Sequence, residues 1–176
     1  MKKKINIAIA GFGNIGSYFY KFLQKNKSDI SIKTGKIPIV KYICAKNINK
    51  KRLIKIPKSK WINNPLDLSS MEDIDIIVEL IGGSEGVAKK LVFSALRNKK
   101  HVITANKALI AKYGDQLAAL AEKNKVNLEY EASVAGGVPT WSPHGDFPVV
   151  QLLVPEVKLR MVFFIHTLLT IPEAQI

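Results

Sequence analysis

Short apolar segments alternate with helical patterns along most of this chain. Apolar side chains recur at helical spacing from Ile15 to Leu23 and again in residues 84–96 and 108–123. Five apolar segments predict strands around these helices: residues 5–10, 37–45, 74–81, 101–104 and 126–131. Strands that alternate with helices form a mostly parallel sheet with both faces covered. The pattern therefore predicts a doubly wound α/β fold.

The connecting segments show no clear period. Residues 25–36 are polar and predict only a connection, and residues 46–64 are basic and irregular. Four of the eight prolines fall within residues 141–176. We therefore expect an irregular C-terminal tail there, too short to form a second domain.

A glycine motif joins the first predicted strand to the first predicted helix. Gly11 permits a tight turn, Gly13 lets a pyrophosphate approach the backbone, and Gly16 allows the helix to pack close to the strand. The helix N-terminus then offers N–H groups to the phosphates. The motif in this context predicts a Rossmann-like dinucleotide-binding domain. The turn residues expected to contact the cofactor are Gly11, Phe12, Gly13, Asn14, Ile15 and Gly16.

The end of the second predicted strand indicates which cofactor is preferred. A carboxylate there would bind the ribose hydroxyls of NAD, but the strand ends with Cys44, Ala45 and Lys46, and more basic residues follow. Lys46 suits the 2′-phosphate of NADP, so NADP is favoured over NAD. A solvated basic loop is the alternative interpretation for any one lysine.

Two further segments end strands at the carboxyl edge of the sheet, where ligands of open α/β sheets bind. One contains Ile81 and Gly82, and the other runs from Thr104 to Lys107. We expect Ile81, Gly82, Thr104 and Lys107 to contact the cofactor. Lys107 is also the candidate for a charged group beside a reacting carbonyl, and an ordinary surface lysine is the alternative.

Four segments together resemble homoserine dehydrogenase: residues 7–16, 75–83, 102–109 and 131–139. They occur in the order of the family and cover about residues 4–140. The first is shared by many dehydrogenases, whereas the last two are far more specific. Residues 104–109 also disfavour a different dehydrogenase or another aldehyde-binding relative.

The resemblance implies reduction of aspartate 4-semialdehyde to homoserine with NAD(P)H, a step in threonine and methionine biosynthesis. It implies that Lys107 orients the substrate or polarises its carbonyl. It also implies a monovalent cation, usually sodium, which suits oxygen ligands. The implied ligands are the Glu131 side chain and the backbone carbonyls of Val134, Gly136 and Val138.

The resemblance ends where the tail begins. We expect an NAD(P)-binding domain in residues 1–140 and an unmatched tail in residues 141–176, without the family's substrate-binding domain. The family is usually homo-oligomeric, and its dimer contacts belong to that missing domain. This predicts an incomplete enzyme. The alternative is a stand-alone NAD(P)-binding module or redox-sensing regulator, and the sequence shows no DNA-binding helix pair that would support it.

The net charge of +13 is also typical of nucleic-acid binders. The lysines are scattered and no nucleic-acid motif accompanies them. We therefore expect a solvated basic surface that attracts small anions and no nucleic-acid partner. No apolar run reaches the roughly 18 residues of a membrane span, and the basic start leads directly into the first strand. We expect a cytoplasmic protein without a membrane partner.

The single cysteine and the histidines receive no catalytic role. Cys44 alone excludes an internal disulfide and a cysteine zinc cluster, and it falls within a predicted core strand. His101 is expected to cap the start of a strand. His144 and His166 lie in the unmatched tail.

Overall fold

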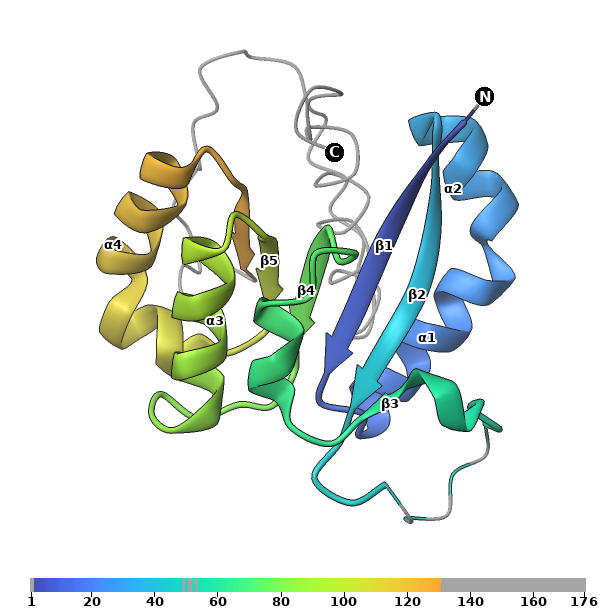
Figure 1. Ribbon diagram of the computed structural model, residues 1–176, viewed down its shortest axis with the longest axis horizontal. Helices are drawn as coiled ribbons and strands as arrows, with labels where there is room; N and C mark the ends of the chain where they lie inside the picture. Colours follow the sequence, from blue (N-terminus) through green and yellow to red (C-terminus); the bar gives the residue numbers. More distant parts are fainter. Residues whose placement is uncertain (1, 49, 51, 53, 131–176) are drawn as a thin grey trace, which may run out of the picture.

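The computed structural model describes residues 2–48, 50, 52 and 54–130, and these residues form a single sheet with helices on both faces (Figure 1). The elements in chain order are β1 (Lys3–Ala10), α1 (Asn14–Lys25), α2 (Lys27–Thr34), β2 (Lys36–Cys44), η1 (Lys58–Lys60), β3 (Trp61–Ile62), η2 (Pro65–Ser69), β4 (Ile76–Glu79), α3 (Val87–Arg97), β5 (His101–Thr104), α4 (Lys107–Asn124) and β6 (Leu128–Tyr130).

The sheet has the strand order β3-β2-β1-β4-β5-β6, and all its pairs are parallel. The chain builds outward from β1 to β3 and then returns to the other side of β1, where β4 begins the second half. This order is that of the doubly wound dinucleotide-binding fold. The predicted fold class is confirmed. The order reverses between β1 and β4, which marks the ligand site of such sheets.

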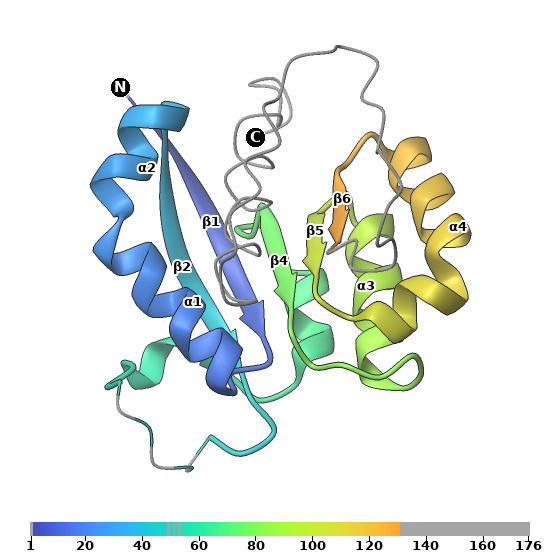
Figure 2. The same cartoon turned by 180° about the vertical axis from the view of Figure 1, so that it is seen from behind.

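Two hydrophobic layers hold the helices on the sheet. Alternate residues of β1 face opposite sides, so Ile5, Ile7 and Ile9 pack with α1 and α2. Ala8 and Ala10 pack with α3 and α4 on the other face. Figures 1 and 2 show the two helix pairs on opposite sides of the sheet. A sheet covered on both faces explains why its strands are almost continuously apolar.

Two predictions for the connecting segments are wrong. The segment expected to be a simple connection contains the helix α2, which buries Ile30 and ends at Gly35 with φ of 71°. The basic segment contains the short strand β3, which pairs with Ile43 and Cys44 at the end of β2. Both elements are stabilised by packing against distant residues, so local periodicity does not reveal them. The predicted tail lies outside the described residues.

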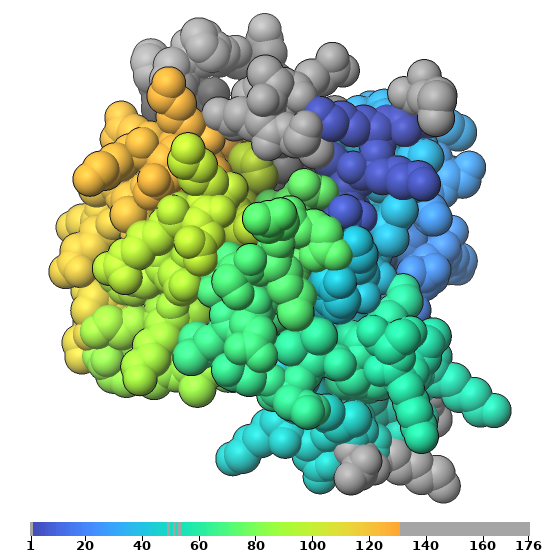
Figure 3. All heavy atoms as spheres, in the orientation of Figure 1, coloured from blue at the N-terminus to red at the C-terminus, as the bar shows by residue number. Residues whose placement is uncertain are grey.

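The described residues between β2 and β3 extend beyond the carboxyl edge of the sheet and form a lobe at the bottom of the space-filling view (Figure 3). This lobe stands next to the glycine turn that follows β1. Among the described residues, no helix combines the length and apolar character needed to cross a membrane.

Candidate cofactor-binding site

The turn after β1 can be made only by glycine at its first position. Gly11 has φ of +104°, and a Cβ there would lie 2.5 Å from the carbonyl carbon and oxygen of Leu80. The Gly11 N–H donates to the Cys44 carbonyl at 2.9 Å, and the Leu80 N–H donates to the Ala10 carbonyl at 2.7 Å. The turn is therefore held between the ends of β2 and β4, at the point where the strand order reverses.

The other two glycines of the motif have different surroundings. A Cβ at Gly16 would lie 2.3 Å from the Gly11 carbonyl oxygen, so this glycine lets α1 pack against the turn. A Cβ at Gly13 would meet nothing within 4 Å. Gly13 is also the N-cap of α1, and no side chain caps this helix. The open space at Gly13 and the uncapped N–H groups fit a pyrophosphate.

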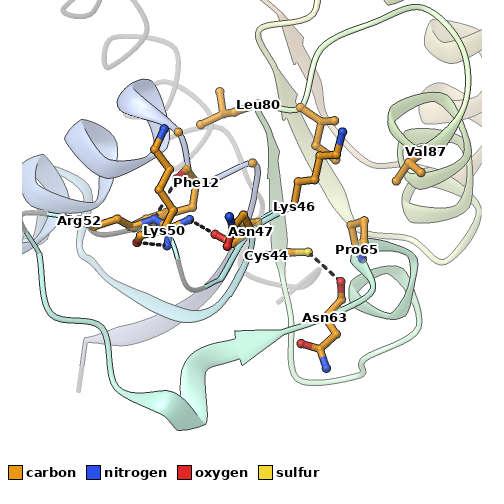
Figure 4. Close-up of a pocket in the computed structure, with 14 residues that line it drawn as sticks. Phe12, Cys44, Lys46, Asn47, Lys50, Arg52, Asn63, Pro65, Leu80 and Val87 are labelled. Carbon is orange, nitrogen blue, oxygen red and sulfur yellow. Dashed lines mark hydrogen bonds between the residues drawn. The ribbon is translucent and has the colours of Figure 1, made fainter.

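A cavity of about 670 Å³ lies beside this turn (Figure 4). Its volume is within the range of small-molecule and cofactor sites. It is bounded by the glycine turn, by the segment after β2 and by the segment after β4. Five of the predicted cofactor-binding residues line it: Gly11, Phe12, Gly13, Lys46 and Ile81.

The basic segment after β2 is organised around Arg52. Its guanidinium donates to four carbonyls, those of Phe12 at 3.3 Å, Ile48 at 2.8 Å, Lys50 at 3.0 Å and Asn47 at 2.7 Å. These contacts join the basic segment to the glycine turn.

The Arg52 guanidinium also lies 4.9 Å from the centre of the Trp61 ring, a favourable cation–π contact. This role was missed from the sequence, where Arg52 stood out only as one of several basic residues. Among the described residues, Lys46 and Lys50 are the other cations that line the cavity. Figure 4 shows Lys50 beside Phe12 and Arg52, and Lys46 on the side of Val87.

A buried carboxylate connects the segments that follow β4 and β5. Glu79 is 0% exposed. Its Oε1 accepts from the N–H groups of Ile81 at 2.7 Å and Gly82 at 3.0 Å, and its Oε2 accepts from the Thr104 hydroxyl at 2.5 Å. The Thr104 hydroxyl is therefore already hydrogen-bonded within the protein. Glu79 lies in one of the predicted strands, residues 74–81, and no role for it was predicted.

Lys107 begins α4 and is exposed. Asn106 caps this helix, because its Oδ1 accepts from the Leu109 N–H at 3.1 Å. A cation at the first position of a helix opposes the helix dipole. Within the described residues Lys107 forms no hydrogen bond or ion pair that would compensate. A charge kept where it costs stability is typical of a functional position.

The remaining predicted contacts are distributed around the turn. Asn14 lines an adjoining cavity of about 310 Å³, which shares Phe12 and Gly13 with the larger one. Ile15 is exposed on α1, and Gly16 is buried beneath the turn. Gly82 follows Ile81 with φ of 84°. The cofactor contacts of these residues stay predictions.

The structural roles expected for Cys44 and His101 are confirmed. Burial raises the pKa of the Cys44 thiol to about 11, so it stays protonated at neutral pH. His101 is the first residue of β5, and its Nδ1 accepts from the Asn127 N–H at 3.0 Å. Burial lowers the pKa of His101 to about 4, which keeps the ring neutral.

The predicted cation site lies outside the described residues, since its ligands were expected at Glu131, Val134, Gly136 and Val138. Within residues 2–48, 50, 52 and 54–130, no cluster of three or more His, Cys, Asp or Glu side chains could hold a metal ion. The sodium site stays a prediction.

A family model described as homoserine dehydrogenase, NAD binding domain, matches residues 11–131. Homoserine dehydrogenases of Neisseria gonorrhoeae and Bacillus subtilis are each 39% identical to this chain over 137 residues, which make up 78% of this chain and 31% of each relative. The crystal structure of S. aureus homoserine dehydrogenase at pH 8.5 is similar with a TM-score of 0.71 and 39% identity. That likeness covers 78% of this chain and 34% of the S. aureus chain.

The chain thus spans about a third of the length of these relatives. The matched part begins at the first glycine of the turn and takes in both loops at the carboxyl edge, so the likeness includes the candidate site. The chain belongs to the homoserine dehydrogenase family, of which it carries the NAD-binding domain.

Proposed function

We propose that this chain supplies the cofactor-binding domain of an enzyme that reduces aspartate 4-semialdehyde to homoserine with NAD(P)H. The observation that carries the proposal is the turn from Gly11 to Gly16. It combines the open position at Gly13, an uncapped helix N-terminus and a cavity of about 670 Å³ in one place. These are the features that a dinucleotide requires.

The topology supports one orientation of the cofactor. In a doubly wound sheet the dinucleotide crosses the carboxyl edge at the reversal of strand order, here between β1 and β4. With the pyrophosphate at Gly13, the adenosine half lies toward the basic segment after β2. The nicotinamide half lies toward the segments after β4 and β5, which contain Ile81 and Lys107.

The charges around the adenosine half favour NADP. Lys46 and Lys50 both line the cavity, whereas Arg52 is already held by backbone carbonyls. The strand β2 ends without a carboxylate that would bind the free ribose hydroxyls of NAD. The two lysines therefore supply the positive charge that a 2′-phosphate needs.

The chain's own contribution to the reaction centres on Lys107. The reduced nicotinamide, when bound, supplies a hydride to the aldehyde carbon while a proton goes to the oxygen, so an alcohol and the oxidised cofactor result. Lys107 lies at the carboxyl edge beside the nicotinamide half, and its ammonium group would stabilise the negative charge that develops on the oxygen. The segment from Thr104 to Asn106 determines where the helix that carries Lys107 begins.

Titration of the purified chain with NADPH and NADH, followed by nicotinamide fluorescence, tests the cofactor proposal. Lys46→Ala should weaken NADPH binding by about 10-fold, the value of one charge-assisted hydrogen bond, and should change NADH binding much less. The matched control is Lys123→Ala, which removes an exposed lysine from the last turn of α4, the end away from the carboxyl edge.

The proposal would be refuted if the unaltered chain bound neither NADPH nor NADH. An equal loss for both nucleotides in Lys46→Ala would refute the preference for NADP. For the substrate, aspartate 4-semialdehyde and succinate semialdehyde should be compared as oxidants of bound NADPH. Oxidation of NADPH by succinate semialdehyde but not by aspartate 4-semialdehyde would identify a different dehydrogenase.

A further inference from the structure

We infer that Glu79 is a positioning residue that locks the two loops of the nicotinamide half into one rigid unit. This inference rests on the proposed function, because it concerns the site of the same cofactor. Glu79 ends the central strand β4, next to Ala10 of β1 on one side and Thr104 of β5 on the other. Its carboxylate is thus centred under the carboxyl edge of the sheet.

In the part of the chain that the structure describes, the hydrogen bonds of this carboxylate come from the loop after β4 and from the end of β5. It accepts two N–H groups from the loop after β4, those of Ile81 and Gly82, and one hydroxyl from Thr104, the last residue of β5. Among the described residues, none of the cations pairs with it. A buried carboxylate without a cation is retained only where hydrogen bonds satisfy it.

The contacts continue beyond the carboxylate and close a ring. The Thr104 hydroxyl accepts from the Asn106 N–H at 3.0 Å. The Asn106 side chain then donates to the Gly83 carbonyl at 2.6 Å, which returns the ring to the loop after β4. The oxygen of the same side chain caps α4. The ring therefore joins Ile81, which lines the cavity, to the helix start that carries Lys107.

The donors around Glu79 require a carboxylate. Two N–H groups and one hydroxyl are directed at its two oxygens. A carboxylate can only accept, so the Thr104 hydroxyl donates to it while the Thr104 oxygen accepts from the Asn106 N–H. Glutamine keeps one acceptor oxygen but places an NH₂ group opposite Thr104. The amide can then donate to the second lone pair of the Thr104 oxygen, but the hydroxyl proton loses its acceptor, so the contact that joins the two loops is weakened.

The ring acts on one half of the cofactor only. Its members all belong to β4, β5 and the loops that follow them, whereas the basic segment after β2 is held separately by Arg52. Loosening the ring should therefore disturb the nicotinamide half and leave the adenosine half bound. This difference separates a positioning role from a general loss of structure.

The test compares NADPH with 2′-phospho-ADP-ribose, which has the same adenosine half but no nicotinamide. In Glu79→Gln and Thr104→Val, NADPH affinity should fall by about 3- to 10-fold, the value of one hydrogen bond, and the fluorescence of bound nicotinamide should change. Affinity for 2′-phospho-ADP-ribose should stay within about 2-fold. Thr104→Ser keeps the hydroxyl, so this variant should show the NADPH affinity and nicotinamide fluorescence of the unaltered chain.

A second variant avoids the buried carboxylate. Asn106→Asp keeps the acceptor that caps α4 but cannot donate to Gly83, so it opens the ring from the other side. It should show the same selective loss of NADPH affinity.

Native NADPH affinity and fluorescence in Asn106→Asp and Thr104→Val would overturn the inference, and so would an equal loss of both ligands. If the unaltered chain bound neither ligand, the proposed function itself would fail.

Discussion

Replacing Gly13 by alanine should abolish tight cofactor binding and leave the fold intact. Gly13 has φ of −82° and ψ of −153°, an extended conformation that alanine also adopts. The added Cβ would meet no protein atom within 4 Å. The methyl group would instead project into the space that the pyrophosphate is expected to occupy, at the uncapped N-terminus of α1.

The magnitude follows from the hydrogen bonds at stake. A hydrogen bond from a backbone N–H to a charged phosphate contributes about 1.5–3 kcal/mol, so losing one weakens NADPH binding by roughly 10- to 150-fold. Alanine is a poorer N-cap than glycine by about 0.5–1 kcal/mol. It also restricts the unfolded chain by about 0.4–1 kcal/mol, which offsets that cost. The free energy of unfolding should therefore change by less than about 1 kcal/mol.

The assay pairs NADPH titration by nicotinamide fluorescence with thermal unfolding of the same samples. Gly16→Ala is the contrasting variant, because its Cβ would lie 2.3 Å from the Gly11 carbonyl oxygen. It should destabilise the fold by about 1–3 kcal/mol through overpacking. Native NADPH affinity in a stably folded Gly13→Ala variant would show that the pyrophosphate does not lie over this turn.

Three further predictions concern charged groups. Acid should destabilise the fold through His101, because its pKa of about 4 lies below the ordinary 6.5 and the unfolded chain takes up the proton first. The free energy of unfolding should fall by up to about 3 kcal/mol between pH 7 and pH 4, and His101→Asn should lose most of this slope in urea unfolding. An equal slope in both proteins would contradict the assignment. Arg52→Met should weaken NADPH binding by about 10-fold by releasing the basic segment, and unchanged affinity would refute that role. Lys107→Gln should raise the free energy of unfolding by about 0.3–1 kcal/mol by removing the cation from the helix start, whereas a lower melting temperature would count against this.

Local sequence patterns determined the fold class and the position of the turn. The apolar periods identified five of the strands, and the glycines at 11, 13 and 16 identified the turn. Gly11 and Gly16 each meet a steric demand of the turn, and Gly13 leaves open space beside it. The structure then brings Gly13, Lys46 and Ile81 to one cavity, as the rule for carboxyl edges predicted. These features depend on short segments, and for that reason the sequence reveals them.

The elements and roles that escaped prediction depend on residues far apart in the chain. The helix α2 is amphipathic only weakly and is held by burial of Ile30 against the sheet, and β3 exists because Trp61 and Ile62 pair with the end of β2. The contact between Glu79 and Thr104 joins residues 25 positions apart. Their side chains meet only because β4 and β5 lie side by side in parallel register. Periodicity and motifs describe neighbours in sequence, whereas hydrogen bonds across a sheet depend on which strands become neighbours in space, and that is decided by packing of the whole domain.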